Sequence, residues 1–524
     1  MTSKALTRRQ LFTMTGGVIS VGLLAASGAP AAAASPAAAP AGQPKPGGTL
    51  RYGTGSNSSE LDPHLTGDVA AWQVINQVYE QLLILDEKET PQGSLAEKFE
   101  VSPDGLSYTF NLRKGVKFHN GREMTSADVK YSIERIVNPK TAARAVIYFE
   151  TLKSLDTPDP YTFKMTLSKP YAPMLFALAR LETAIVPKEE VEKQGGNLSK
   201  MMVGTGPFRF VERVKDVHVK LVKNPDYWKK GLPYLDEILY KPIVDQDIRL
   251  TNLKTGEVDI IQDMHPKDAA AVAADKSLAL QEVVSTYWPN MAMNCSRKPY
   301  SDVKVRQAIH SALDRSKVLQ LVAFGKGQLS ETMVPPGNPF RLEIPQWKQD
   351  KAKAKALLAE AGYPNGFETV YRAMPSTVPL AEVVQAQLKE VGITVKIERV
   401  EDTTWFGDVF PVNKRNYDMS GATHASKIDP DLTMWDILHS RGTKNYTATS
   451  IPELDKLLDD GRTITDMAKR KEIYNEAQKI FVEKSGYVTY YLQPLLYASR
   501  PQVKNWKGPV SSAEVRFTEV WLDK

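Results

Sequence analysis

The residues best suited to metal or acid–base chemistry lie around Asp429 and among the histidines. Asp429-Pro430-Asp431 places two carboxylates two residues apart, as a calcium-binding loop does, but the third acid and the turn glycine are missing. We therefore expect this segment to cap a helix. His424 and His439 are too far apart to share one helix face, so we expect no metal site and no cofactor.

Other reactive side chains favour structural roles. His119 lies beside Asn120-Gly121, a turn sequence, so we expect its ring to bond to backbone. Cys295, the only cysteine, has no motif around it and is expected to be a small buried thiol. The sequence contains no nucleophile elbow, phosphate-binding loop or zinc-protease motif. We therefore predict a protein that is not an enzyme, with an exported hydrolase as the distant alternative.

The start of the chain predicts export. Arg8-Arg9, a short apolar run and Ala32-Ala33-Ala34 follow the order of a twin-arginine signal peptide over residues 1–34, and residues 35–46 form an Ala/Pro-rich leader. No cysteine follows the signal, so we expect a soluble periplasmic protein without a lipid anchor. Removing three cations lowers the formal net charge from +6 to +3, which excludes a typical nucleic-acid binder. No later segment is apolar enough to cross a membrane.

The elements that must position these residues change in character along the chain. Over about residues 85–200, turn sequences such as Ser102–Gly105 separate strands with alternating apolar residues, which predicts a largely antiparallel module. A capping box at Thr125–Asp128 opens a helix in this module. Roughly 490 mature residues exceed one hydrophobic core, so we expect at least two domains.

The second half reads as an α/β domain. Strand, helix and strand signals at residues 369–371, 380–391 and 393–397 form a βαβ unit, which predicts a parallel sheet. Ser301 and Asp314 are expected to cap two consecutive helices. Further helices are predicted over Asp350–Ala361 and Asp466–Lys484.

Nine phrases distributed over nearly the whole mature chain resemble one family, the extracytoplasmic solute-binding proteins of ABC importers in the dipeptide, oligopeptide and nickel branch, known as family 5. Each phrase alone is weak, but their order and spacing together are specific. They are Gly47–Leu50, Leu61–His64, Ser102–Gly105 with Phe110–Gly121, Ser126–Val129, Gly204–Phe208, Asn224–Trp228, Leu253–Asp259, Val305–Ile309 and Ala354–Gly362.

The resemblance implies a bilobal α/β clamshell with an extra subdomain in the first lobe. Lobe I would comprise residues 47–288 plus 490–524, including the subdomain at about 85–203, and lobe II residues 289–489. The resemblance also implies a monomeric binding protein that encloses a small solute between its lobes and delivers it to ABC permease subunits coupled to a cytoplasmic ATPase.

The same resemblance suggests cleft residues. Trp405 matches a cleft tryptophan that would stack on the solute, with a core tryptophan as the alternative. Ser426 stands where the dipeptide-binding members have an aspartate for the ligand's amino terminus, and no arginine follows Met374-Pro375 to take its carboxylate. The predicted ligand-binding residues are Ser56, Asn57, Tyr287, Trp288, Trp405, His424 and Ser426.

These departures leave the solute open. We expect an oligopeptide or peptide-like molecule held by backbone hydrogen bonds and roomy pockets. An oligosaccharide or opine-like compound stacked on Trp405 is the main alternative. A nickel or metal chelate is less favoured, because only His424 and His439 offer imidazole near the expected cleft.

Overall fold

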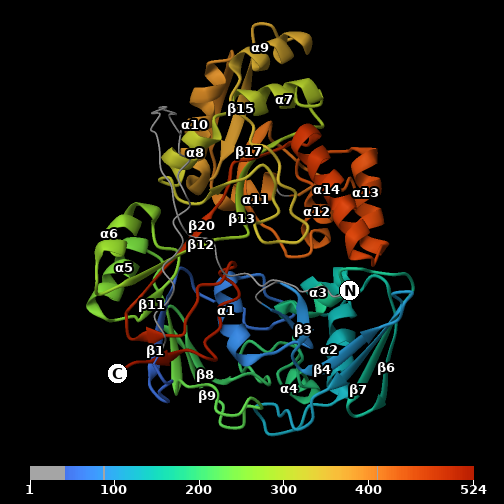
Figure 1. Cartoon of the computed structure of the whole chain (residues 1–524), viewed down its shortest axis with the longest axis vertical. Coiled ribbons are helices and arrows are strands. Elements are labelled where there is room, and N and C mark those ends of the chain that lie inside the picture. The colour runs from blue at the N-terminus through green and yellow to red at the C-terminus, as the bar shows by residue number, and fades with distance from the viewer. Residues whose placement is uncertain (1–41, 59, 87–88, 410) are drawn as a thin grey trace, which may run out of the picture. The chain divides into compact units, whose positions relative to one another are not determined.

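The computed structural model describes residues 42–58, 60–86, 89–409 and 411–524. The predicted signal over 1–34 and most of the leader lie outside these residues. All described elements belong to the compact unit Gln43–Lys524 (Figure 1). Within the described part of the chain, no helix has the length and apolarity needed to span a bilayer.

A seven-stranded mixed sheet has the order β12-β20-β11-β1-β10-β9-β8. The first strand, β1, pairs in parallel with β10 and β11, and the other neighbours are antiparallel. Helix α1 packs against β8. The elements are β1 (Thr49–Thr54), α1 (Val69–Val78), β8 (Phe208–Val214), β9 (His218–Lys223), β10 (Glu237–Pro242), α5 (Gln246–Thr255), β11 (Ile260–Ile261), η3 (Pro266–Asp268), α6 (Ala269–Ala274), β12 (Ala279–Val284) and β20 (Pro494–Ser499).

A four-stranded antiparallel sheet of order β4-β5-β7-β6 forms what we call the β4–β7 module. The predicted capping box is confirmed, since the Asp128 side chain accepts from the Thr125 backbone N–H at 2.9 Å. The module comprises β4 (Ala96–Val101), β5 (Ser107–Leu112), α2 (Ser126–Val137), η1 (Arg144–Phe149), β6 (Leu152–Asp159), β7 (Thr162–Leu167), α3 (Met174–Leu178), η2 (Leu181–Thr183) and α4 (Lys188–Lys193), and is preceded by the ribbon β2 (Leu83–Leu85) and β3 (Pro91–Gly93).

A five-stranded sheet has the order β16-β15-β17-β13-β18. The predicted βαβ unit is confirmed, because β15 and β16 pair in parallel and α10 connects them. Asp314 caps its helix as expected, but Asp302 and not Ser301 caps the preceding one, since the Asp302 carboxylate accepts from the backbone N–H of Lys304. The elements are β13 (Tyr287–Met293), α7 (Val303–Ala312), α8 (Arg315–Val322), α9 (Lys351–Glu360), β15 (Phe367–Ala373), η4 (Pro375–Thr377), α10 (Val378–Lys389), β16 (Ile393–Arg399), β17 (Met419–Ala425) and β18 (Tyr487–Thr489).

Four further helices and two short ribbons complete the described elements. The helix predicted over Asp466–Lys484 is confirmed as α14, the longest among the described residues, and Asp466 is its N-cap. Helix α13 packs on both α12 and α14. The bounds are α11 (Asp402–Asp408), α12 (Asp431–Leu438), α13 (Pro452–Thr463), α14 (Met467–Lys484), β14 (Gln328–Leu329) paired with β19 (Tyr491–Leu492), and β21 (Val503–Lys504) paired with β22 (Trp521–Leu522).

The chain changes sheets at two places. Strand β12 ends at Val284 in the seven-stranded sheet and β13 starts at Tyr287 in the five-stranded sheet. The chain returns between β18, which ends at Thr489, and β20, which starts at Pro494. These crossings are compatible with the predicted lobe boundaries, which stay a prediction.

Candidate functional site

The Asp429-Pro430-Asp431 segment is held by buried ion pairs. Both oxygens of Asp429 accept from Arg470 at 2.8 Å, and one also accepts from the backbone N–H of Asp431 at the start of α12. Asp431 pairs with Arg462 at 3.2 Å, and burial raises its pKa to about 7. Within the described ranges, no group of three potential metal ligands occurs. The segment opens α12 as expected, but Pro430 is the N-cap residue and its side chain forms no cap hydrogen bond. The ion pairs of the two acids fix the loop that leads from β17 into α12.

His119 and Cys295 have structural surroundings. The Nε2 of His119 lies 2.9 Å from the carbonyl oxygen of Gly206, which confirms the expected backbone bond. Cys295 is half-buried and not fully buried as expected, and its thiol contacts the carbonyl of Met293 and the hydroxyl of Thr449. Burial raises the pKa of this thiol, which disfavours the reactive thiolate.

A cavity of about 120 Å³ lies where the loop after β17 meets η2 and the segment before β13. Its walls come from sequence-distant segments, including residues 179–182, 425–429 and four residues between 510 and 514, namely Val510, Ser511, Ala513 and Glu514. We call it the Lys427 cleft. The charged side chains that line its polar walls are Arg180, Glu182, Lys427, Asp429 and Glu514.

Lys427 is the least compensated cation of this cleft. Its Nζ donates a 2.8 Å hydrogen bond to the hydroxyl of Tyr148 on η1. Burial, followed by the charge of Arg180, lowers the pKa of Lys427 to about 8. Throughout the part of the chain that the structure describes, Lys427 forms no ion pair. An ammonium in this setting is well placed to receive an anionic group.

The walls of the Lys427 cleft also contain acidic side chains. Arg180 and Glu182 pair with each other at 2.8 Å. Burial raises the pKa of Glu182, but Arg180 and then Lys427 outweigh it, so the net shift is downward and Glu182 stays ionised. Glu514, in contrast, has no ion-pair partner among the described residues. The cleft thus offers one cation, Lys427, and one anion, Glu514, that form no ion pair among the described residues.

Two of the predicted site residues lie in or beside the cleft. Ser426 lines it, although its hydroxyl donates to the carbonyl of Met333 at 2.6 Å. The Tyr287 and Ser512 hydroxyls are 3.1 Å apart, next to the cleft-lining Thr286 and Ser511. That Ser426 and Tyr287 contact the solute stays a prediction.

Three predicted residues pack together in or against the core behind β13 and β17. Trp288 is fully buried, and its ring lies 5.1 Å from that of His424. Burial lowers the pKa of His424 to about 4, so this imidazole is neutral. Trp405 is only 2% exposed, and its indole N–H donates to the Ser420 hydroxyl at 2.7 Å. This packing favours the alternative in which Trp405 is a core residue.

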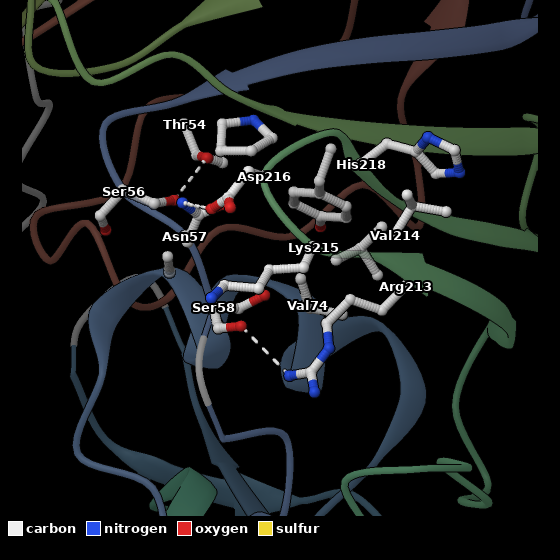
Figure 2. A pocket seen from close by; sticks show the side chains of 14 residues that line it. Thr54, Ser56, Asn57, Ser58, Val74, Arg213, Val214, Lys215, Asp216 and His218 are labelled. Carbon is white, nitrogen blue, oxygen red and sulfur yellow. Dashed lines mark hydrogen bonds between the residues drawn. The ribbon is translucent and has the colours of Figure 1, made fainter.

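Ser56 and Asn57 line another cavity, of about 280 Å³, between the loop after β1 and the β8–β9 hairpin (Figure 2). The Asn57 amide points at the Asp216 carboxylate and donates to it at 2.6 Å (Figure 2). Arg213 donates to the carbonyl of Ser58 at 3.2 Å. None of the other five predicted residues lines this cavity, so the structure does not bring the predicted set together.

Sequence reasoning missed Lys427, Arg180, Glu182 and Glu514. Lys427 could have been predicted from the sequence, because it directly follows Ser426, which is one of the predicted ligand-binding residues. The other three lie in segments that come together only in the folded chain, and their surroundings in sequence contain no motif.

The comparisons with known proteins agree with this architecture. The family model for bacterial extracellular solute-binding proteins, family 5 Middle, matches residues 90–445. The glutathione-binding protein GsiB of Salmonella choleraesuis (strain SC-B67) is 29% identical over 454 residues, covering 85% of this chain and 89% of that protein.

Two solved structures are similar over most of the chain. The ABC transporter-associated periplasmic binding protein DppA of Helicobacter pylori, in complex with the peptide STSA, has a TM-score of 0.80 at 28% identity, covering 92% of this chain and 99% of that one. The binding protein AgaA from A. tumefaciens R10, in complex with agropinic acid, has a TM-score of 0.79 at 30% identity, covering 91% and 99%.

These matches have the mixed α/β fold of periplasmic binding proteins, and the relatives named are binding proteins and not enzymes. The chain therefore belongs to the family 5 bacterial extracellular solute-binding proteins, the extracytoplasmic proteins that bind the solutes of ABC importers.

Proposed function

We propose that the protein captures an oligopeptide or peptide-like zwitterion in the Lys427 cleft and delivers it to an ABC permease. One observation carries this proposal: Lys427 and Glu514 line the same cleft with opposite charges, and neither has an ion-pair partner among the described residues. A peptide's carboxylate would lie beside Lys427 and its ammonium beside Glu514.

The energetics of desolvation support a zwitterion. A charged end group that enters a partly dry cleft loses water and needs an opposite charge or hydrogen bonds in return. The Lys427 ammonium already lies in such surroundings, and among the described residues the Tyr148 hydroxyl is the one side-chain group that accepts a hydrogen bond from it. A carboxylate at this position would also favour the charged form of Lys427, whose pKa burial has lowered.

The cleft must open to admit such a solute. Its volume of about 120 Å³ is below the roughly 300–1,000 Å³ typical of small-molecule pockets. We propose that the segments around it separate as two lobes, residues 47–288 plus 490–524 against 289–489, with the subdomain at about 85–203 in the first. The two sheet crossings and the separate β4–β7 module support this division.

The relatives support a peptide and leave one second candidate. DppA is in complex with a peptide, and GsiB is named as glutathione-binding. AgaA, 30% identical, is in complex with agropinic acid, which favours an opine-like acid as the alternative solute. Either solute class would use Lys427 for its acidic group.

Native mass spectrometry of the purified mature protein tests the proposal. We expect one copurifying or added peptide per chain, retained without turnover, and a lower bound fraction for Lys427→Gln. A bound glycan, or a stoichiometrically bound metal without an organic solute, would contradict it.

The cell biology of the proposal follows from the sequence. We propose a monomer that is exported by the twin-arginine route and works in the periplasm without a lipid anchor. Replacing Arg8 and Arg9 by lysine should block export, whereas undiminished export would indicate the general secretory route.

A further inference from the structure

A second, larger cavity adjoins the Lys427 cleft. It has a volume of about 340 Å³ and lies between the β4–β7 module and helices α12 and α13. Tyr148 lines this cavity, and its hydroxyl accepts the hydrogen bond from Lys427, which lines the cleft. The two spaces therefore approach each other at the Lys427–Tyr148 contact. We call the larger space the Trp435 cavity.

The walls of the Trp435 cavity combine aromatic rings with charged side chains, and only some of these charges are paired. Tyr148, Tyr171 and Trp435 supply rings, and Ile147 and Pro170 supply aliphatic surface. The Arg462 guanidinium lies 4.1 Å from the Trp435 ring centroid and pairs with Asp431, while Arg441 pairs with Asp459 at 2.7 Å. Lys169 and Glu150 also line it, one of each sign. The three rings offer stacking surface to a bulky aromatic group.

One polar group in the wall lacks a partner. Thr151 lines the cavity and is 6% exposed, and its hydroxyl has no hydrogen bond within the described part of the chain. Buried hydroxyls are nearly always hydrogen-bonded. An occupant with a polar group at the end of its ring would form a hydrogen bond with the Thr151 hydroxyl.

We infer that the Trp435 cavity is a side-chain subsite of the solute cleft and that it selects peptide-like solutes with a large aromatic side chain, tyrosine above all, on the residue that carries the carboxylate. The inference rests on the proposed function, since it places that carboxylate at Lys427. The side chain of the solute's carboxylate-bearing residue would start near Tyr148, which contacts Lys427. It would then extend past Tyr148 into the Trp435 cavity.

Calorimetric titration with Ala-Gly, Ala-Phe and Ala-Tyr tests the subsite. Burying an aromatic ring predicts at least about tenfold tighter binding of Ala-Phe than of Ala-Gly, with Ala-Tyr tightest. Ile147→Trp fills the cavity from a side chain that is 40% exposed, so folding should tolerate it. This variant should lose the preference for Ala-Phe while binding Ala-Gly as the wild type does.

Val146→Trp is the matched control, because Val146 is also 40% exposed but does not line the cavity. It should keep the wild-type preference. Thr151→Val should remove the advantage of Ala-Tyr over Ala-Phe and leave Ala-Phe binding intact.

Two results would overturn the subsite. If Ile147→Trp and the wild type prefer Ala-Phe over Ala-Gly by the same factor, the aromatic ring lies elsewhere and only the subsite fails. If none of the three dipeptides binds the wild type, the proposed function fails together with the subsite.

Discussion

Lys427 and Tyr148 are 279 residues apart in the chain, yet the Lys427 ammonium donates a 2.8 Å hydrogen bond to the Tyr148 hydroxyl. The contact joins the loop after β17 to η1 of the β4–β7 module. Tyr171 reinforces this junction with a 3.5 Å hydrogen bond to Asp431. Because these bonds join the segment that follows β17 to the β4–β7 module, any separation of the two must break them, and a solute bound between them can replace them.

The buried pair of Asp429 and Arg470 should dominate the stability of the cleft loop. Arg470→Met leaves the Asp429 carboxylate buried without its partner, which should lower the free energy of unfolding by about 3–5 kcal/mol. Lys456→Ala is the control, since it breaks an exposed pair with Asp460 and should cost at most about 1 kcal/mol. Denaturant unfolding measures both, and equal small losses would show that the Asp429–Arg470 pair carries little stability.

Replacing Trp405 should affect folding and not solute binding. Trp405→Ala empties a site that is 2% exposed and should reduce the free energy of unfolding by about 3–5 kcal/mol with unchanged solute affinity. The neighbouring Phe406 is 51% exposed, so Phe406→Ala should change stability far less. Melting temperature and affinity measured side by side decide the matter. Weaker solute binding with an unchanged free energy of unfolding would show that Trp405 contacts the solute.

Buried histidines should make the fold sensitive to acid. Burial, then the charge of Arg315, lowers the pKa of His310 to about 3, against about 6.5 in an unfolded chain. Below pH 6.5 the unfolded state therefore binds a proton that the folded state does not, so stability falls as the pH drops. The pKa of His64, His119 and His424 is likewise lowered to about 4.

The His310→Asn variant isolates one of these groups. Its unfolding free energy should fall less steeply than that of the wild type between pH 6.5 and 4.5, because one proton uptake on unfolding is missing. Parallel slopes for the two proteins would mean that His310 titrates alike in the folded and unfolded states.

Local sequence signals predicted much of the fold correctly. The alternating strands of the β4–β7 module, the Thr125–Asp128 capping box and the β15-α10-β16 unit depend on neighbouring residues, and these were found. The one-residue error at Asp302 shows the limit of cap assignment, since Ser301 and Asp302 are both good capping residues.

The site was harder to predict because it is made by sequence-distant segments. Nothing in the sequence around Glu514 or Arg180 shows that both line a cleft with Lys427. Conversely, Trp288 and Trp405 were chosen by type and position, but whether an indole faces solute or core depends on packing from β17 and its neighbours. The length and apolarity of the surrounding sequence segment do not distinguish a tryptophan that faces solute from one in the core.

In the proposed function, the Lys427 ammonium receives the solute's carboxylate. Calorimetric titration with Ala-Phe and with its C-terminal amide tests it directly, in the wild type, in Lys427→Gln and in the control Lys456→Gln on the exposed face of α13. A charge-assisted hydrogen bond predicts that the wild type and the control bind the free acid roughly 10- to 100-fold more tightly than the amide. Lys427→Gln should bind the two alike. Equal affinities for acid and amide in the wild type would contradict the account.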